Sequence, residues 1–129
     1  MSVPLRGRQL RRTSRKRLLV EDKAEQLVAE IARLRRRLNY PGSNAALHLE
    51  KSGDSVLFNL AEGIVCFKPR LKVSKYEIAR SEAREVQQAL NALVLKRELN
   101  AADIVLADDL ADCVIAMLTN MIKNLEARL

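Results

Sequence analysis

The sequence predicts an all-α protein, an antiparallel up-down-up-down four-helix bundle. Hydrophobic residues make up 48% of the 129-residue chain, which is enough for a core, while aromatic residues make up only 3%. The apolar residues are chiefly Leu, Ala, Val and Ile, and glycine and proline are scarce, which favours helices. Four segments space their apolar residues three and four apart, and no segment of useful length has the period of a strand.

The first two helices occupy the N-terminal half of the chain. The first is expected from about residue 15–20 to residue 37, and a turn that contains Pro41 and Gly42 ends it. The second begins near Ser43 or Asn44, either of which is a good N-cap. It runs to Glu62.

The last two helices follow a short apolar connection. The third begins at Pro69, which is tolerated in a first turn, and continues to about Arg97. A turn over residues 98–101 leads into the fourth. That helix has two apolar lines and therefore needs two neighbours, either two bundle helices or a partner subunit. The lines are Ile104, Ala107, Ala111, Val114, Leu118, Met121 and Leu125, and Leu106, Leu110, Cys113 and Met117.

Small residues in the second helix raise a separate question. Gly63 lies where a helix end needs positive φ, so we expect it to end the helix. Ser52 and Gly53 fall inside the helix, where glycine costs about 1 kcal/mol relative to alanine. We expect them to permit close approach of a neighbouring helix.

The positive charge is concentrated at the N-terminus. The formal net charge is +7, and the residues after 17 carry 16 basic and 16 acidic groups. We therefore divide the chain into a basic arm, residues 1–17, and a bundle domain, residues 18–129. Such an arm suits an anionic polymer such as RNA or DNA. A solubilising tail and an organelle transit peptide are the alternatives. The cations of the arm are Arg6, Arg8, Arg11, Arg12, Arg15, Lys16 and Arg17.

Antiparallel topology places further charges at the two ends of the bundle. At one end, bases close the first and third helices and acids open the fourth, as the helix dipole favours, so stability explains this end. At the other end, cations at the start of the third helix oppose its dipole, which favours anion binding over a solvated face. These cations are Lys68, Arg70, Lys72 and Lys75.

Few residues suggest catalysis. The single histidine, His48, has no second histidine or cysteine at metal-ligand spacing, and the di-iron bundles need Glu-x-x-His pairs. No phosphate-binding loop or nucleophile motif is present. We therefore expect no enzyme activity, no metal and no cofactor.

Cys66 and Cys113 are expected to be buried thiols in a reducing compartment, and no apolar run could span a membrane. The expected location is the cytoplasm.

A family resemblance adds to this interpretation. The segments HLEKSGDSV, residues 48–56, and NLAEG, residues 59–63, resemble a signature Q-L-R-R-A-A-x-S-I-x-x-N-I-A-E-G of the four helix bundle protein family. The segment ARSEARE, residues 79–85, resembles that family's A-x-G-S-x-x-E. The family includes proteins encoded by intervening sequences in bacterial large-subunit ribosomal RNA genes. The chain differs in having Ile64-Val65-Cys66-Phe67 where the family has a Gly- and Arg-containing loop, and the basic arm is not a general family feature.

The resemblance implies a ring-shaped homopentamer. Relatives are accessory proteins of diversity-generating retroelements, in which a basic pentamer associates with a reverse transcriptase and nucleic acid. The apolar run over Ile64, Val65 and Phe67 lies in a connection, where polar residues are usual, so we expect it at a subunit interface.

Four polar residues are expected to form a structural cluster between the second and third helices. Asn59 and Glu62 are three residues apart on one helix face, and partly buried polar groups need partners. The cluster comprises Asn59, Glu62, Ser81 and Glu85, and we expect Ser81 or Arg84 to supply partners across the helix pair.

The sequence thus favours a non-enzymatic, self-associating bundle that binds nucleic acid. The alternative is a protein-interaction scaffold, such as a reverse-transcriptase accessory subunit, whose arm only solubilises it.

Overall fold

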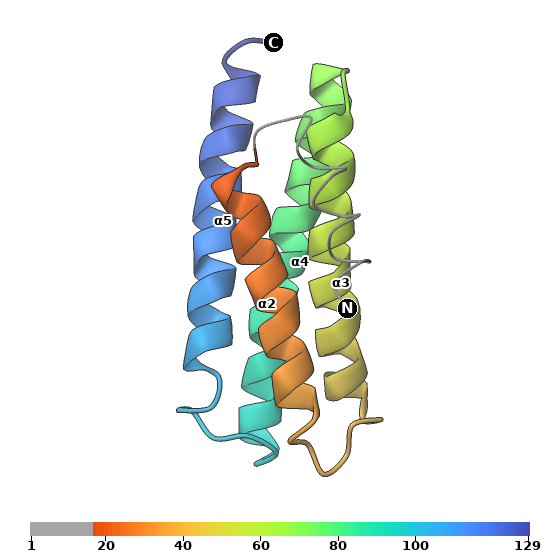
Figure 1. Cartoon of the computed structure of the whole chain (residues 1–129), viewed down its shortest axis with the longest axis vertical. Helices are drawn as coiled ribbons and strands as arrows, with labels where there is room; N and C mark the ends of the chain where they lie inside the picture. The colour runs from red at the N-terminus through yellow and green to blue at the C-terminus, as the bar shows by residue number, and fades with distance from the viewer. Residues whose placement is uncertain (1–16) are drawn as a thin grey trace, which may run out of the picture.

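The part of the chain that the structure describes folds into four antiparallel helices that pack as a bundle (Figure 1). The computed structural model describes residues 17–129. Its helices are α2 (Leu19–Arg35), α3 (Asn44–Val65), α4 (Pro69–Leu95) and α5 (Val105–Glu126). Each helix packs against the next in the chain, and α2 also packs against α5, which closes the bundle. The expected all-α, four-helix architecture is confirmed.

The helix ends follow local sequence signals. The Ser43 hydroxyl caps α3 by accepting a hydrogen bond of 3.2 Å from the Ala46 N–H, as its side chain predicts. Pro69 opens α4 as expected. Beyond the C-terminus of α4, Arg97 takes a left-handed conformation with φ of 62°, and the Glu98 N–H reaches back to the Leu93 carbonyl. This is the Schellman arrangement, with arginine where glycine is usual.

Gly63 does not end α3. The helix continues to Val65, and no glycine of the described chain has positive φ. Gly63 is buried against α4, where an added Cβ would lie 2.6 Å from Cε1 and 2.8 Å from Cδ1 of Tyr76. The physical reason for this glycine is therefore the close approach of two helices, because any side chain would collide with the Tyr76 ring.

Gly53 has the role expected of it. It faces α2, and an added Cβ there would lie 2.6 Å from Cδ1 of Ile31. Ser52 beside it is also buried, with 2% of its surface exposed. Gly53 therefore lets α2 and α3 pack closely.

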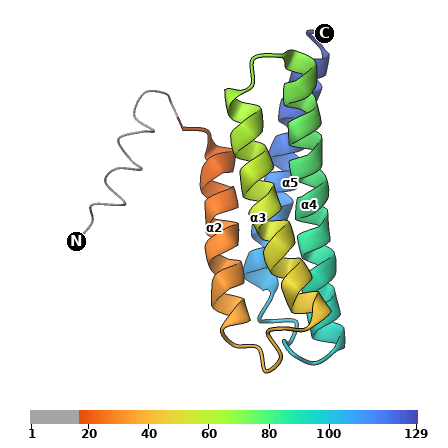
Figure 2. The same ribbon diagram turned by 90° about the vertical axis from the view of Figure 1, so that its right-hand side faces the viewer.

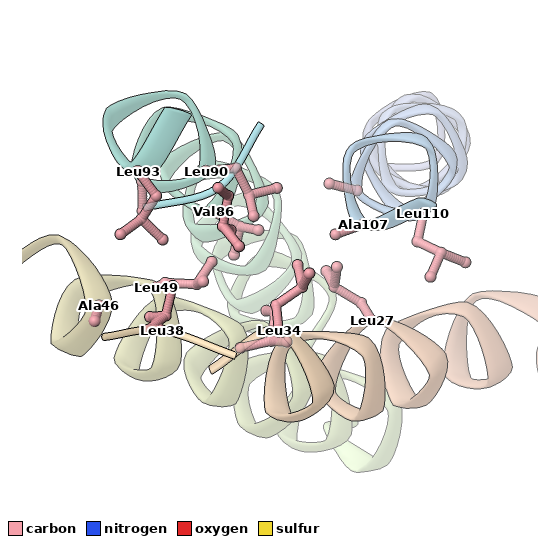
Figure 3. Packing of buried hydrophobic residues seen from close by; sticks show 14 residues of the cluster. Leu27, Leu34, Leu38, Ala46, Leu49, Val86, Leu90, Leu93, Ala107 and Leu110 are labelled. Carbon is pink, nitrogen blue, oxygen red and sulfur yellow. The ribbon is translucent and has the colours of Figure 1, made fainter. Parts of the chain in front are cut away.

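The core consists of two apolar clusters along the bundle axis. Figure 3 shows the first, in which side chains such as Leu27, Leu49 and Leu90 come from three helices and meet in the interior. The second surrounds Tyr76 and Leu118 near the other end. The thiols of Cys66 and Cys113 are free and only half-buried, not fully buried as the sequence suggested. In the part of the chain that the structure describes, no helix is apolar over the length that a bilayer crossing needs.

We predict that the two buried glycines respond differently to alanine. Gly63→Ala should lower the free energy of unfolding by about 1–3 kcal/mol, because the Tyr76 ring is packed in the core and cannot move aside. Gly53→Ala should stay within about 1 kcal/mol of the parent, because the end of the Ile31 side chain can rotate and the helix gains propensity. Urea denaturation measures both. Equal losses for the two variants would contradict this interpretation of Gly63.

Candidate nucleic-acid interface

Six of the seven cations of the basic arm lie outside the described residues: Arg6, Arg8, Arg11, Arg12, Arg15 and Lys16. The seventh, Arg17, donates hydrogen bonds to the Asp22 carboxylate, the shorter of 2.7 Å, and lies 3.3 Å from Glu25. The hydrogen bond to Asp22 is the main reason that the pKa of Arg17 is raised. Arg17 therefore belongs to the start of α2 rather than to a free cationic surface.

Lys72 caps the C-terminus of α3. Its Nζ donates to the carbonyls of Gly63 and Ile64 at 2.6 and 2.9 Å, and it lies 5.5 Å from the centroid of the Tyr76 ring. Burial lowers the pKa of this ammonium group. A cation at the negative end of a helix is stabilising. Lys72 was expected to oppose the dipole of its own helix and to meet an anion; the structure shows instead that it stabilises the negative end of α3.

Lys75 is also occupied within the bundle. Its Nζ lies 2.8 Å from Oε1 of Glu62, so the ion pair joins the last turns of α3 to the second turn of α4. Two of the four cations at this end, Lys72 and Lys75, therefore have protein partners. The two that remain, Lys68 and Arg70, are exposed at the start of α4, whose first turn contains no acidic residue.

The opposite end of the bundle is held together by paired charges. Arg37 lies 3.0 Å from Asp103, and the Glu98 carboxylate accepts hydrogen bonds from the backbone N–H groups of Asn39 and Tyr40 at 3.0 and 3.2 Å. The pKa of Asp103 is lowered, chiefly by a hydrogen bond from the Asn100 N–H and further by Arg37. These contacts agree with the expectation that stability explains the charges here.

The expected polar cluster between α3 and α4 does not form. Asn59 donates to the carbonyl and the hydroxyl of Ser55, one turn earlier in its own helix, at 2.9 and 3.0 Å. Glu62 pairs with Lys75, and Ser81 is exposed. Glu85 instead lies 2.9 Å from Nε2 of His48.

The register of the two helices explains this outcome. Glu62 of α3 stands opposite Lys75, and His48 stands opposite Glu85. Lys75 and Glu85 are ten residues apart, about 15 Å along α4. Glu62 and Glu85 therefore lie at different levels of the bundle and cannot share a site.

The residues expected at a subunit interface differ in exposure. Phe67 leaves 97% of its surface exposed and Val65 leaves 65%. Ile64 is only partly exposed and packs against the second core cluster. Phe67 and Val65 are therefore available for contact with another molecule, whereas Ile64 mainly supports the bundle.

Three carboxylates gather at the start of α5. Single oxygen atoms of Asp108, Asp109 and Asp112 lie within 4.8 Å of one another, and Gln87 donates a hydrogen bond of 2.7 Å to Asp112. Burial, followed by the charge of Asp112, raises the pKa of Asp108. The sequence placed these acids at a helix N-terminus, where the dipole favours them, and their spacing along one helix brings them together.

The fold resembles that of a solved protein of unknown function. That protein, from the S23 ribosomal protein family of Bacteroides thetaiotaomicron VPI-5482, superimposes with a TM-score of 0.76 and 20% sequence identity. The match covers 81% of this chain and 99% of the other. No protein-family model and no curated protein sequence matches the chain. The likeness establishes a shared fold.

We predict that Lys72 stabilises the bundle and that Lys68 does not. Lys72→Met keeps the apolar stem but removes two charge-assisted hydrogen bonds, so the free energy of unfolding should fall by about 1–2 kcal/mol. Lys68→Met, one turn away and exposed, should change it by less than about 0.5 kcal/mol. Thermal denaturation compares the two variants. A stable Lys72→Met protein would show that the α3 carbonyls need no lysine cap.

Proposed function

We propose that the protein is a non-enzymatic, self-associating four-helix bundle that binds nucleic acid through its basic arm and the adjoining end of the bundle. The observation that carries the proposal is the distribution of charge: residues 1–17 contain seven cations and no acid, while the rest of the chain is balanced. A segment of this kind suits a phosphate backbone, whose counterions it releases on binding.

The start of α4 extends this basic surface. Lys68 and Arg70 are exposed, and no acid in the first turn neutralises the positive end of the helix. Phosphate oxygens are favoured at such an end. Lys72 and Lys75, in contrast, are engaged by α3, so we assign them to stability rather than to the ligand.

Two likenesses support the family assignment within this proposal. The NLAEG segment resembles the proteins encoded within ribosomal RNA genes, and the backbone resembles a member of the S23 ribosomal protein family. We infer from them that the chain is a relative of these proteins. A ring of subunits would then display several arms together, and avidity would strengthen binding to a long polyanion.

A protein-interaction scaffold is the second candidate. The exposed Phe67 favours it, because an aromatic residue left 97% exposed beside a helix start suits a protein partner such as a reverse transcriptase. In that case the arm would only maintain solubility. The two candidates differ in one measurable property, the dependence of nucleic-acid affinity on salt.

We predict that deleting residues 1–16 strongly weakens binding to RNA or DNA while leaving helical circular dichroism and melting temperature nearly unchanged. Arg17 is retained because it pairs with Asp22 and Glu25 at the start of α2. Fluorescence anisotropy over a salt series should show the log of the affinity falling by about 0.7–0.9 per tenfold rise in salt for each phosphate contact of the full chain. The slope should be smaller after deletion.

A charge-preserving control separates charge from sequence in the arm. Replacing its arginines by lysine should retain most of the salt slope, since counterion release depends on charge. The Lys68→Gln, Arg70→Gln double variant should lower the salt slope by at most the amount that corresponds to about two phosphate contacts. Unchanged affinity of the deleted chain at physiological salt would rule out the arm as the binding element.

We predict that the protein is a homo-oligomer, a pentamer by family resemblance, with Phe67 at the subunit contact. Phe67→Asp should shift the mass in solution toward smaller species without loss of helix, because the side chain makes little contact within its own bundle. Leu95→Asp is the matched control: this residue is 74% exposed at the other end of α4 and should leave the mass unchanged. Light scattering that gives the monomer mass for the parent protein at micromolar concentration would refute the assembly.

A further inference from the structure

The outward side of α3 carries a stripe that no other helix of the described bundle covers. In Figure 2, α3 lies in front, between α2 and α4, with α5 behind it. Six positions on this side are spaced four, three, four, three and four residues apart, which is the spacing of a coiled-coil seam. All six are exposed: Leu47, Lys51, Asp54, Phe58, Ala61 and Val65.

The stripe is more apolar than the solvated side of a helix should be. Four of its six residues are apolar, and Leu47, Phe58 and Val65 leave 49%, 65% and 65% of their surfaces exposed. Its two charged residues, Lys51 and Asp54, form no ion pair with any residue that the structure describes. The fold of a single chain therefore explains neither the apolar residues nor the position of the two charges.

The order of residues along the stripe is self-complementary. If two copies of α3 lie antiparallel about a two-fold axis midway between Lys51 and Asp54, each Lys51 faces the Asp54 of the other copy. The same axis places each Leu47 opposite the other Phe58, so apolar layers flank two ion pairs. Two-fold symmetry requires this reciprocity, because one patch must fit itself.

Other pairings of the same stripe are worse. In a parallel pair, Lys51 faces Lys51 and Asp54 faces Asp54, and like charges repel. An antiparallel pair shifted by one heptad sets Asp54 against Phe58 and Lys51 against Ala61, which covers charges without partners. The charges thus select one orientation and one register.

We propose that the outward side of α3 is a two-fold docking surface for a second copy of this chain, paired antiparallel through Leu47, Lys51, Asp54 and Phe58. The contact is independent of the proposed nucleic-acid function, and its four pairing residues do not belong to the proposed ring contact. Phe67 lies beyond the C-terminus of α3, so the two surfaces can be removed separately. If the α3 contact and the ring contact both form, the α3 contact joins two rings. If the ring does not form, the α3 contact alone produces a dimer.

Charge exchange between two variants tests the pairing. The measurements use full-length chains that carry Phe67→Asp, so that association through α3 alone is read by sedimentation velocity. Lys51→Asp gives two facing aspartates in a homodimer, and Asp54→Lys gives two facing lysines. Each variant alone should dimerise about tenfold more weakly than the Phe67→Asp parent. An equimolar mixture of the two should recover the affinity of the parent within about twofold, because every facing pair is then opposite in charge.

Controls keep the result interpretable. Glu77→Lys reverses an exposed charge on α4 and should leave the dimer affinity unchanged. Circular dichroism confirms that each variant is folded, as expected for substitutions at exposed positions. A mixture that associates no more tightly than either variant alone, or a parent that stays monomeric at high micromolar concentration, would overturn the proposal.

Discussion

The close contact between Gly63 of α3 and the ring of Tyr76 of α4 sets the geometry on which the rest of the bundle depends. Because Gly63 has no side chain, the ring can lie against the α3 backbone and contribute to the second core cluster. The same approach brings Lys72 within reach of the carbonyls that end α3, and it aligns Glu62 with Lys75. Packing, capping and ion pairing at this end therefore follow from one glycine.

The sequence was sufficient for features that depend on neighbouring residues. The apolar spacing located all four helices, and Ser43 and Pro69 located two helix starts, because capping chemistry is local. Features that depend on the register between helices were not predictable. The spacing of Asn59 and Glu62 fixes their positions on α3 but not the level of Ser81 or Glu85 beside them, so the expected cluster was wrong. Lys72 was misjudged for the same reason, because the helix C-terminus that it caps belongs to α3 and not to its own helix, α4.

The described surface separates two kinds of exposed group. Cations that the bundle uses, such as Arg17, Lys72 and Lys75, have carboxylate or carbonyl partners, whereas Lys68 and Arg70 remain in solvent at the start of α4. The exposed apolar residues include a row on the outside of α3 and the side chain of Phe67. Under the proposed function, a polyanion at the start of α4 and a second copy of the chain at the outside of α3 would therefore meet different parts of the bundle, whereas Phe67 directly adjoins Lys68.

The connectivity also has a kinetic consequence. Among the described helices, only α2 and α5 pair without being consecutive in the chain, and α2 is the shortest, with 17 residues. The three pairings between consecutive helices close short loops and form quickly, whereas the pairing of α2 with α5 must close the length of the bundle domain. Because α2 is the shorter helix of that pair, we expect it to detach first. Since residues 1–16 precede α2 in the chain, a pull on the arm would act first on α2 and not on the three helices that follow it.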